Sequence, residues 1–320
     1  TKMAVHTELS EANINKILKN YQLGELIKFT GIKEGIENTN YLLRTRDKNF
    51  IITIFEKRVD IKQIPFYFEV MTNSHSKGIH CPVPIKDKNG ELVNKVKNKK
   101  MAIFGFLEGN SKKKWNEDDC FMVGQKLAQF HLANINNKLK AKNNFSLNFW
   151  KKIYLNCLNK FNTVIPNSLN IISDEINFIS FNWPKNLPEG VIHADLFPDN
   201  VFFKKQKISG FLDFYFSCCD FLSYDLAITI NAWCFYKYKF KEDFFLSLIS
   251  GYQSVRKLET KEVKNINILL RGASLRFLFT RVYDSLNSNE GEFLKKKDPL
   301  EFFNILKFHI KVNVAKKYFE

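Results

Sequence analysis

Hydrophobic residues in the first part of the chain follow two kinds of spacing. Apolar residues recur at helical spacing in residues 10–20, and Ser10 precedes them where a helix N-cap is expected. Residues 65–76 carry a second helical pattern. Apolar runs of strand length, separated by polar turn segments, occur at residues 27–31, 40–44, 50–55 and 101–107. This part of the chain is therefore predicted to form a small sheet with two helices.

After Gly109 the pattern becomes mainly helical. Helical periodicity covers residues 118–133, 147–160, 172–181, 224–233, 244–252 and 264–286. The segment Phe106, Leu107, Glu108 and Gly109 marks the crossover between the two patterns. The chain is therefore predicted to be α+β with two lobes: residues 1–108 form a small antiparallel sheet lobe, and residues 109–320 form a larger, mainly helical lobe.

One polar loop interrupts the helical half and carries a chemical pattern. Residues 191–203 read VIHADLFPDNVFF, so His193, Asp195 and Asn200 have the HxDxxxxN spacing of a phosphotransferase catalytic loop. Phosphoryl transfer requires a carboxylate beside the acceptor hydroxyl and oxygen ligands that hold Mg²⁺ on the phosphates. Asp195 and Asn200 supply one group of each kind. Because any polar loop can carry these residues by chance, a second signal is needed.

The second signal lies thirteen residues beyond Asn200. The apolar run 208–212 leads into Asp213, Phe214 and Tyr215, which resembles the DFG segment of kinases, with the KKQK run at 204–207 suited to a hairpin tip. Such a hairpin would bring Asp213 and Asn200 together as metal ligands. We therefore expect a two-lobed, protein-kinase-like fold that binds ATP and Mg²⁺. Tyr215 stands where a protein kinase has Gly, which favours a small-molecule enzyme over one with a regulated activation segment.

The nucleotide side of the pattern is less regular. Gly35, Asn38 and Thr39 lie between two strand candidates, where a kinase folds a loop over the phosphates, although a plain hairpin fits the same residues. Phe106 and Glu108 lie where a kinase hinge binds the adenine ring. Thr53 occupies the strand position at which a kinase has its phosphate-binding Lys. The nearby cations Arg44, Lys57 and Arg58 are alternative replacements, and the sequence leaves the choice open.

Charge and composition exclude several other functions. The formal net charge of +16 suggests a nucleic-acid partner, but only seven of the 49 basic residues are Arg, and the Lys are spread along the chain. We predict no nucleic-acid partner. No apolar run approaches the length of a membrane span, and the first residues lack the pattern of a signal peptide, so a cytoplasmic protein without membrane contact is expected. The six Cys show no CxxC pair and are predicted to be reduced.

The combination of HADLFPDN, DFY and the segment DFLSYDLA at 220–227 resembles the aminoglycoside phosphotransferase and choline kinase superfamily. Across almost the whole chain, the resemblance extends to its homoserine kinase branch, the ThrB type. The segments that carry it include GIKEGIENTNYLLRT, GIHCPVPIKDKNG, DFYFSCCDFLSYDLAITINAWCF and RGASLRFLFTRVYD. The resemblance implies transfer of the ATP γ-phosphoryl group to the hydroxyl of L-homoserine, a step of threonine biosynthesis.

The resemblance also implies roles for the loop residues. Asp195 would accept the proton of the acceptor hydroxyl or orient its oxygen, and His193 would brace the loop. Asn200 and Asp213 would hold Mg²⁺ through oxygen atoms. Asp225, near the start of a helix, is expected to cap that helix and to bind the catalytic-loop backbone.

A homoserine site must bind a carboxylate and an ammonium group. Arg271, Arg276 and Arg281 are candidates for the carboxylate, but they lie five residues apart on one predicted helix, so at most two can point inward. Salt bridges to Asp220 or Asp284 are the structural alternative for each Arg. Asp220 and Tyr215 follow the hairpin and are the candidates for the ammonium group.

Two other functions remain open from the sequence. The chain could be a superfamily kinase for another small alcohol, such as choline, an amino sugar or hydroxylysine, or a catalytically inactive nucleotide-binding protein. The presence of Asp195, Asn200 and Asp213 argues against the inactive protein, and the Arg residues argue against a choline site, which is typically lined by aromatic rings. The expected partners are ATP and L-homoserine, and the protein is expected to be a monomer or a homodimer.

Overall fold

The chain divides into two units in the computed structural model, which describes residues 7–32, 38–56, 59–287 and 297–319. The first unit comprises Thr1–Gly109 and Ser209–Tyr215, and the second comprises Asn110–Ile208 and Phe216–Glu320. The chain thus leaves the first unit next to the crossover segment expected from the sequence. It returns once, through the residues that contain the DFY motif.

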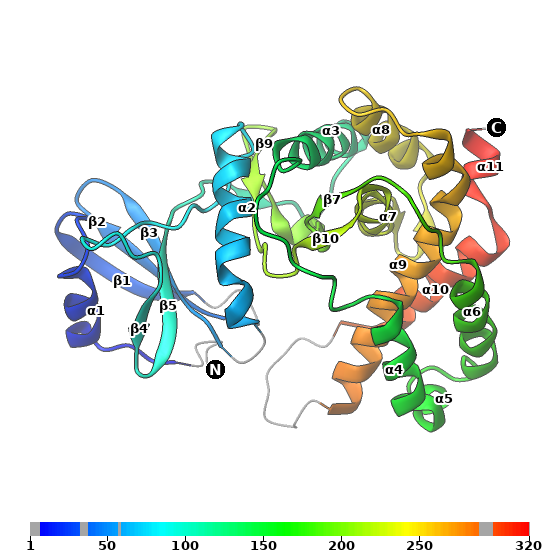
Figure 1. The fold of residues 1–320 in the computed structure, drawn as a ribbon, viewed down its shortest axis with the longest axis horizontal. Helices are drawn as coiled ribbons and strands as arrows, with labels where there is room; N and C mark the ends of the chain where they lie inside the picture. Colours follow the sequence, from blue (N-terminus) through cyan, green and yellow to red (C-terminus); the bar gives the residue numbers. More distant parts are fainter. Residues whose placement is uncertain (1–6, 33–37, 57–58, 288–296, 320) are drawn as a thin grey trace. The chain divides into compact units, whose positions relative to one another are not determined.

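The first unit contains a five-stranded antiparallel sheet (Figure 1). Its strand order is β1-β2-β3-β5-β4, with every neighbouring pair antiparallel. The strands are β1 (Leu26–Ile32), β2 (Thr39–Thr45), β3 (Asn49–Ile54), β4 (Asn94–Val96) and β5 (Lys99–Gly105). The predicted sheet is confirmed. It forms because side chains alternate between the two faces of a strand, so that apolar residues two apart can be buried together.

One face of this sheet packs on α1 (Glu11–Leu18). Ile14 and Ile17 of α1 join a buried cluster with alternating strand residues, among them Leu43, Ile52 and Ile103. Ser10 caps the helix as predicted, because its hydroxyl accepts the N–H of Asn13 while the Asn13 side chain accepts the N–H of Ser10. The residues between these, including Thr53, point to the opposite face of the sheet.

The second helix of the first unit, α2 (Ile64–Ser76), follows a short 3₁₀ turn at Ile61–Gln63. Pro65 stands at its first turn, where no backbone N–H is needed. Phe68 of α2 packs edge-on against Phe104 of β5, with ring centroids 5.5 Å apart. It also contacts Phe55 in a tilted arrangement, at 6.4 Å. These rings fix α2 at the end of the face that bears Thr53.

The second unit is mainly helical, as predicted (Figure 1). All six predicted helices are present, together with α5, α10 and α11. The helices are α3 (Glu117–Ala133), α4 (Leu147–Cys157), α5 (Phe161–Val164), α6 (Leu169–Asn182), α7 (Leu222–Trp233), α8 (Glu242–Gln253), α9 (Thr260–Asn287), α10 (Pro299–Lys311) and α11 (Val314–Tyr318). The sequence does signal α10, through an Asp298 N-cap followed by Pro299.

Helices α3 and α8 approach each other at two glycines. A Cβ atom on Gly124 would lie 2.0 Å from the carbonyl oxygen of Leu248, and one on Gly251 would lie 2.0 Å from that of Phe121. Only glycine permits this backbone contact. The close packing positions His131 of α3 and Tyr252 of α8, which meet beneath the catalytic loop.

Short strands precede and follow that loop, and one of them leads into the first unit. Strand β7 (Glu189–Ile192) pairs antiparallel with β10 (Cys218–Phe221), so that Ile192 lies opposite Cys218. After the loop come β8 (Val201–Lys204) and β9 (Lys207–Phe211), joined by the predicted turn, in which Lys205 and Gln206 have positive φ. The remaining strands are β6 (Asn110–Ser111), β11 (Phe235–Tyr236) and β12 (Lys239–Phe240).

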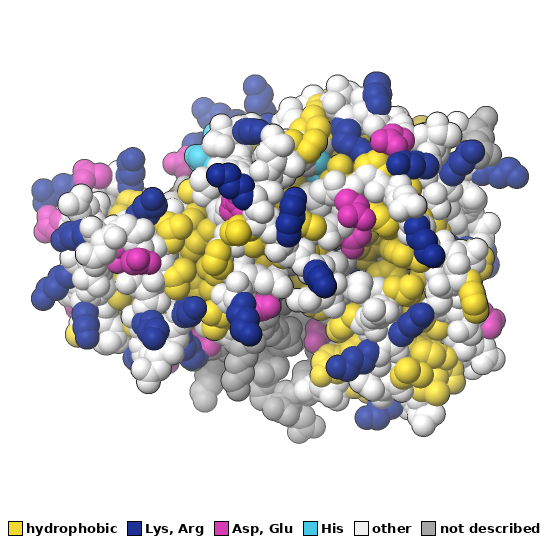
Figure 2. All heavy atoms as spheres, viewed as in Figure 1, with side chains coloured by type: hydrophobic (Ala, Val, Ile, Leu, Met, Phe, Trp, Pro, Cys, Tyr) yellow, Lys and Arg dark blue, Asp and Glu magenta, His cyan; other side chains and the backbone are white. Residues whose placement is uncertain are grey.

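The surface shows no concentration of basic charge on the face in view. Figure 2 shows Lys and Arg side chains scattered among uncharged surface, with Asp and Glu interspersed. Over the described ranges, no helix has the length and apolarity needed to cross a membrane. The positive charge on the face shown in Figure 2 is therefore dispersed.

Candidate active site

The catalytic loop contains a backbone conformation that L-residues rarely adopt. Ala194, between His193 and Asp195, has φ +65° and is buried. A left-handed conformation costs an L-residue about 1–2 kcal/mol, so surrounding contacts must hold it in place. The loop backbone is held from two directions.

Asp225 of α7 holds the N–H side of the loop. Its carboxylate accepts the backbone N–H groups of His193 and Ala194, both at 2.8 Å, and bonds to Nε2 of His131 at 2.9 Å. Burial by itself would raise the pKa of Asp225, but the hydrogen bond and charge of His131 and the contacts of His193 outweigh it, and the pKa is lowered. The carboxylate is therefore ionised and fully buried.

The predicted tie between Asp225 and the loop is observed, but the predicted cap is not. The N-cap of α7 is Phe221, and Asp225 lies in the first turn. The helix begins earlier than expected because Leu222 and Ser223 already have helical geometry, so the carboxylate is directed to the loop instead of to its own helix end.

Arg276 of α9 holds the carbonyl side of the loop. Its guanidinium donates a hydrogen bond to the carbonyl oxygen of Ala194 and lies over the rings of Phe145, Phe216 and Phe277, at 4.6 to 5.7 Å from their centroids. Only 2% of Arg276 is exposed. Ala194 is thus fixed between a buried anion and a buried cation.

Asp195 and Asn200 lie together on this rigid base. Pro198–Asn200 forms a 3₁₀ turn that brings the Asn200 side chain back, and its Nδ2 donates to the carbonyl of Asp195 at 2.8 Å and to its carboxylate at 3.1 Å. Both residues are half-buried. Because the nitrogen of Asn200 is used in this way, its amide oxygen is the atom suited to a metal ion.

Asp213 follows β9 and belongs to the first unit. It also has left-handed backbone geometry, with φ +57°, which Asp tolerates better than most residues. The two predicted metal ligands therefore come from different units. No cluster of three or more His, Cys, Asp or Glu suited to a metal is present among the residues that the structure describes.

The three predicted Arg residues of α9 have different surroundings. Arg271 forms a two-pronged salt bridge to Glu175 of α6, with both N–O distances 2.6 Å. Arg281 binds Glu301 and the carbonyl of Asp298. Their partners are therefore glutamates, and not the aspartates considered from the sequence. Arg276 alone of the three contacts the catalytic loop.

Asp220 of β10 lies in the same unit as Arg276. Its carboxylate accepts the side-chain N–H of Asn143 at 2.7 Å and the backbone N–H of Phe221 at 2.7 Å. Burial raises the pKa of Asp220, and these hydrogen bonds together with the Arg276 charge only partly offset that effect. Asn143 is a site candidate that the sequence gave no reason to single out.

Two of the residues predicted to bind the nucleotide, Asn38 and Thr39, instead form hydrogen bonds within the first unit. Asn38 accepts the backbone N–H of Glu56, and the hydroxyl of Thr39 donates to the Glu56 carboxylate at 2.9 Å. The same carboxylate binds Lys99 and Thr7. These contacts tie the start of β2 to the end of β3.

The other predicted nucleotide residues are exposed or lie outside the described ranges. Phe106 and Glu108 follow β5 and are exposed, and Phe106 retains 41% of its accessible surface. Gly35 and Lys57 lie outside the described residues. Arg44, an alternative cation, is exposed on β2 opposite Asn49.

Beneath Asp225, a buried polar network extends away from the loop. His131 binds the hydroxyl of Tyr252 at 2.8 Å, and Arg256 donates to the same hydroxyl at 3.1 Å while it binds Glu262. Burial raises the pKa of Tyr252, so its hydroxyl is protonated and available as a donor. Sequence reasoning assigned His131 to the core and did not single out Tyr252, because contacts 121 residues apart leave no local pattern.

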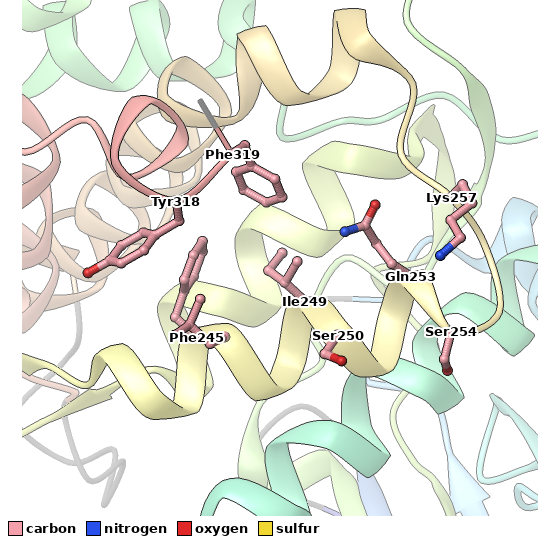
Figure 3. Close-up of a pocket in the computed structure, with 9 residues that line it drawn as sticks. Phe245, Ile249, Ser250, Gln253, Ser254, Lys257, Tyr318 and Phe319 are labelled. Carbon is pink, nitrogen blue, oxygen red and sulfur yellow. The ribbon is translucent and has the colours of Figure 1, made fainter.

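A pocket of about 390 Å³ lies elsewhere in the second unit, between α8 and the C-terminal residues. Figure 3 shows Phe245 and Ile249 of α8 together with Tyr318 and Phe319. None of the predicted site residues lines it. It is therefore separate from the catalytic-loop chemistry.

Comparison with known proteins agrees with this geometry. A model of the phosphotransferase enzyme family matches residues 28–257, which include the catalytic loop and the DFY motif. The chain belongs to this phosphotransferase family. The chain is also 40% identical to a homoserine kinase of Brucella anthropi over 317 residues, which cover 99% of this chain and 97% of that protein. It is 42% identical to a homoserine kinase of Allorhizobium ampelinum over 319 residues, 99% of each.

Solved structures of other phosphotransferases share the fold. Spectinomycin phosphotransferase, in complex with ADP and spectinomycin, has a TM-score of 0.73 and 12% identity, covering 97% of this chain and 100% of its own. Plasmodium vivax ethanolamine kinase has a TM-score of 0.63 and 15% identity, covering 98% of each chain. These structures confirm the predicted kinase-like fold class, and the sequence matches above confirm the predicted family.

Proposed function

We propose that this phosphotransferase transfers the γ-phosphoryl group of ATP to the side-chain hydroxyl of L-homoserine and releases O-phospho-L-homoserine. The observation that carries the proposal is the identity of about 40% with homoserine kinases along the full chain. The catalytic-loop geometry supports it, because Asp195 and Asn200 are preorganised on a clamped backbone. We also propose that the protein acts in the cytoplasm, as a monomer or a homodimer.

Asp195 is the residue proposed to receive the hydroxyl proton of homoserine. Its carboxylate already accepts a hydrogen bond from Asn200, which leaves lone pairs for the acceptor hydroxyl. Phosphoryl transfer has a loose transition state, so orienting the oxygen contributes more than strong basicity. The clamp on Ala194 would keep this orientation constant through turnover.

Asn200 and Asp213 are proposed to hold Mg²⁺. They offer one amide oxygen and one carboxylate, which are hard ligands of the kind that Mg²⁺ prefers. Two such ligands suit an ion that keeps several waters and binds the nucleotide phosphates, and this fits the absence of a larger ligand cluster in the described ranges. When bound, the metal would neutralise charge on the phosphates.

Arg276 and Asp220 are proposed to recognise the two charges of homoserine. Arg276 uses one of its N–H donors on the loop, and the guanidinium has five, so it can also pair with the substrate carboxylate. Asp220 would pair with the ammonium group, which favours its ionised form. Arg271 and Arg281, already paired with glutamates, are assigned to structure.

An assay of ADP release tests the proposal. L-homoserine, L-serine, L-threonine, choline and an aminoglycoside would be compared as acceptors at equal ATP and Mg²⁺. The highest kcat/KM is expected for L-homoserine. A higher value for any other acceptor would reject homoserine as the substrate while leaving the phosphotransferase family intact.

A further inference from the structure

The loop backbone before Asp195 and the loop backbone after it are held by different contacts. Before it, Ala194 lies between the buried anion and the buried cation described above. After it, the indole N–H of Trp233 donates a hydrogen bond to the carbonyl oxygen of Leu196 at 2.8 Å. Asp195 therefore lies between two points at which helix side chains hold the loop.

The hydrogen bond from Trp233 is shielded from water, because Trp233 and Leu196 are both fully buried. The indole has one donor and no acceptor, so the direction of this bond is fixed. A buried carbonyl without a donor is destabilising, so the loop keeps the orientation in which the Leu196 oxygen meets the indole. The contact thus fixes the orientation of one peptide group of the loop.

That peptide group in turn contacts Asp195. It joins Leu196 to Phe197, and the N–H of Phe197 donates to the carbonyl oxygen of Asp195 at 2.8 Å. The side-chain amide of Asn200 donates to the same oxygen at 2.8 Å and to the Asp195 carboxylate at 3.1 Å. Hydrogen bonds at the two ends of a peptide group strengthen each other. The Trp233 indole therefore acts on Asp195 through a single peptide group.

Trp233 is itself held at the end of α7. It is the last residue of that helix, where carbonyl groups lack a partner within the helix. Its carbonyl accepts the indole N–H of Trp115 at 2.8 Å, and the two rings pack edge-on with centroids 5.3 Å apart. Phe203 of β8 contacts the Trp233 ring in a tilted arrangement, at 6.4 Å. Both the main chain and the ring of Trp233 are therefore fixed.

Helix α7 thus holds the catalytic loop twice. Asp225 lies in its first turn and Trp233 is its last residue, which places them about 12 Å apart along the helix axis. The carboxylate accepts backbone N–H groups of the loop, and the indole donates to a loop carbonyl. Because one helix carries both contacts, the backbone on the two sides of Asp195 keeps a constant separation.

We propose that Trp233 is a positioning residue for phosphoryl transfer, whose indole N–H sets the Leu196–Phe197 peptide group and thereby keeps the Asp195 carboxylate aligned with the acceptor hydroxyl. Trp115 supports it by binding its carbonyl. The inference rests on the proposed role of Asp195. Misplacement of a reacting group by about 1 Å can lower a rate about 100-fold, so kcat is the quantity that Trp233 should control.

The test replaces single indole N–H groups by sulfur. β-(3-Benzothienyl)alanine has the shape of tryptophan but no N–H donor, and it would be incorporated at position 233 alone. We expect kcat to fall about tenfold and the KM for ATP to stay within about twofold. Both would be measured with the acceptor that gives the highest kcat/KM in the ADP-release assay, so that failure of the homoserine assignment remains a separate result.

Trp150 provides the matched control. It is also fully buried in the second unit, but its indole nitrogen has no hydrogen-bond partner among the described residues. The same replacement at Trp150 should leave kcat unchanged within about twofold. At Trp115 it should lower kcat about two- to threefold, because that indole acts on the loop through Trp233.

An NMR measurement follows the loop without any need for activity. Labelling leucine with ¹³C at the carbonyl and phenylalanine with ¹⁵N selects Leu–Phe pairs, among them Leu196 and Phe197. The carbonyl signal of Leu196 should shift when Trp233 loses its N–H and stay unchanged when Trp150 does.

A double variant separates positioning of Asp195 from a general loss of stability. In the background of Asp195→Asn, the replacement at Trp233 should lower kcat by less than about twofold more, because the group that it positions is gone. An unchanged kcat after replacement of Trp233, an equal fall after replacement of Trp150, or the full tenfold fall in the Asp195→Asn background would each overturn the proposal.

Discussion

The catalytic loop of the second unit and the β2–β3 strand pair of the first unit differ in how their polar groups are held. At the loop, the ionised side chains of Asp225 and Arg276 bind the backbone of Ala194 from opposite sides. On the strand pair, Thr53 and Asn40 are neutral and bind each other. Charge-assisted hydrogen bonds are about twice as strong as neutral ones.

The backbone explains the difference. Ala194 is held at φ +65°, a conformation that the chain would leave without strong contacts, whereas Thr53 and Asn40 lie on regular strands fixed by their ladder. Of these two places, the buried charges lie at the one whose backbone geometry has to be enforced. Neutral hydrogen bonds are sufficient where the sheet already sets the positions.

The largest effect is expected from Asp195→Asn, which removes the proposed proton acceptor and keeps the loop clamp. Turnover should fall about 10³-fold, since general-base catalysis contributes factors of this order. ATP affinity should stay within a few fold, as measured by calorimetry.

The control for this variant is Asp199→Asn, at an exposed position of the same loop. It should retain near-normal turnover. Normal activity in Asp195→Asn would reject the proposed role of Asp195 as proton acceptor.

Arg276→Lys tests the cationic side of the loop clamp. Lysine keeps the charge but loses the planar fork that reaches the Ala194 carbonyl, so kcat should fall about 10- to 100-fold. Arg271→Lys, on the same helix, loses the two-pronged geometry of the salt bridge to Glu175 and should lower stability with little change in kcat.

The two variants would be compared by steady-state kinetics and urea unfolding. The same loss of kcat in both would show that α9 acts as a whole, and the special role of Arg276 would be rejected.

Tyr252→Phe should have a smaller effect on the loop. It removes the hydroxyl that bonds to His131 and leaves Arg256 without that acceptor, at a cost of about 1–2 kcal/mol in stability and a fewfold loss of kcat. Nitrogen NMR of His131 should show a changed Nδ1 shift, because Nδ1 loses the hydroxyl hydrogen bond while the Asp225 carboxylate keeps the proton on Nε2.

Tyr154→Phe is the matched control, since its hydroxyl bonds to Ser173 away from the loop. It should leave the His131 spectrum and kcat unchanged. An unaltered His131 signal in Tyr252→Phe would show that this hydrogen-bond network does not influence the loop.

A stability change without an activity change is expected for His309→Gln. Burial, and then the charge of Arg271, lower the pKa of His309 to about 3, and its Nε2 bonds to Asn231. The unfolded chain takes up a proton below about pH 6.5, where the folded protein does not. Folding stability should therefore fall as pH drops from about 6.5 toward 3, by up to about 1.4 kcal/mol per pH unit from this group.

Glutamine keeps a donor for Asn231 but does not titrate. Urea unfolding at pH 7, 6 and 5 should show a shallower loss of stability in the variant. Parallel curves for the variant and the wild type would exclude His309 as the source of the acid sensitivity.

Local features of the fold and of the site are predictable from the sequence alone. The spacing of His193, Asp195 and Asn200, the DFY motif and the helical periodicities depend on residues that are neighbours along the chain, and all of these elements are present in the structure. Apolar spacing predicts elements because each element must bury one face. The same local signals identified the family.

Tertiary packing selected which groups from distant parts of the chain meet. It joined Arg276 to Ala194 across 82 residues and directed Asp225 to the loop instead of to its helix end. Three Arg residues on one helix look equivalent in the sequence, since their partners come from other elements. Such contacts are selected by packing and burial of the whole unit, and this is the physical reason that no local pattern revealed them.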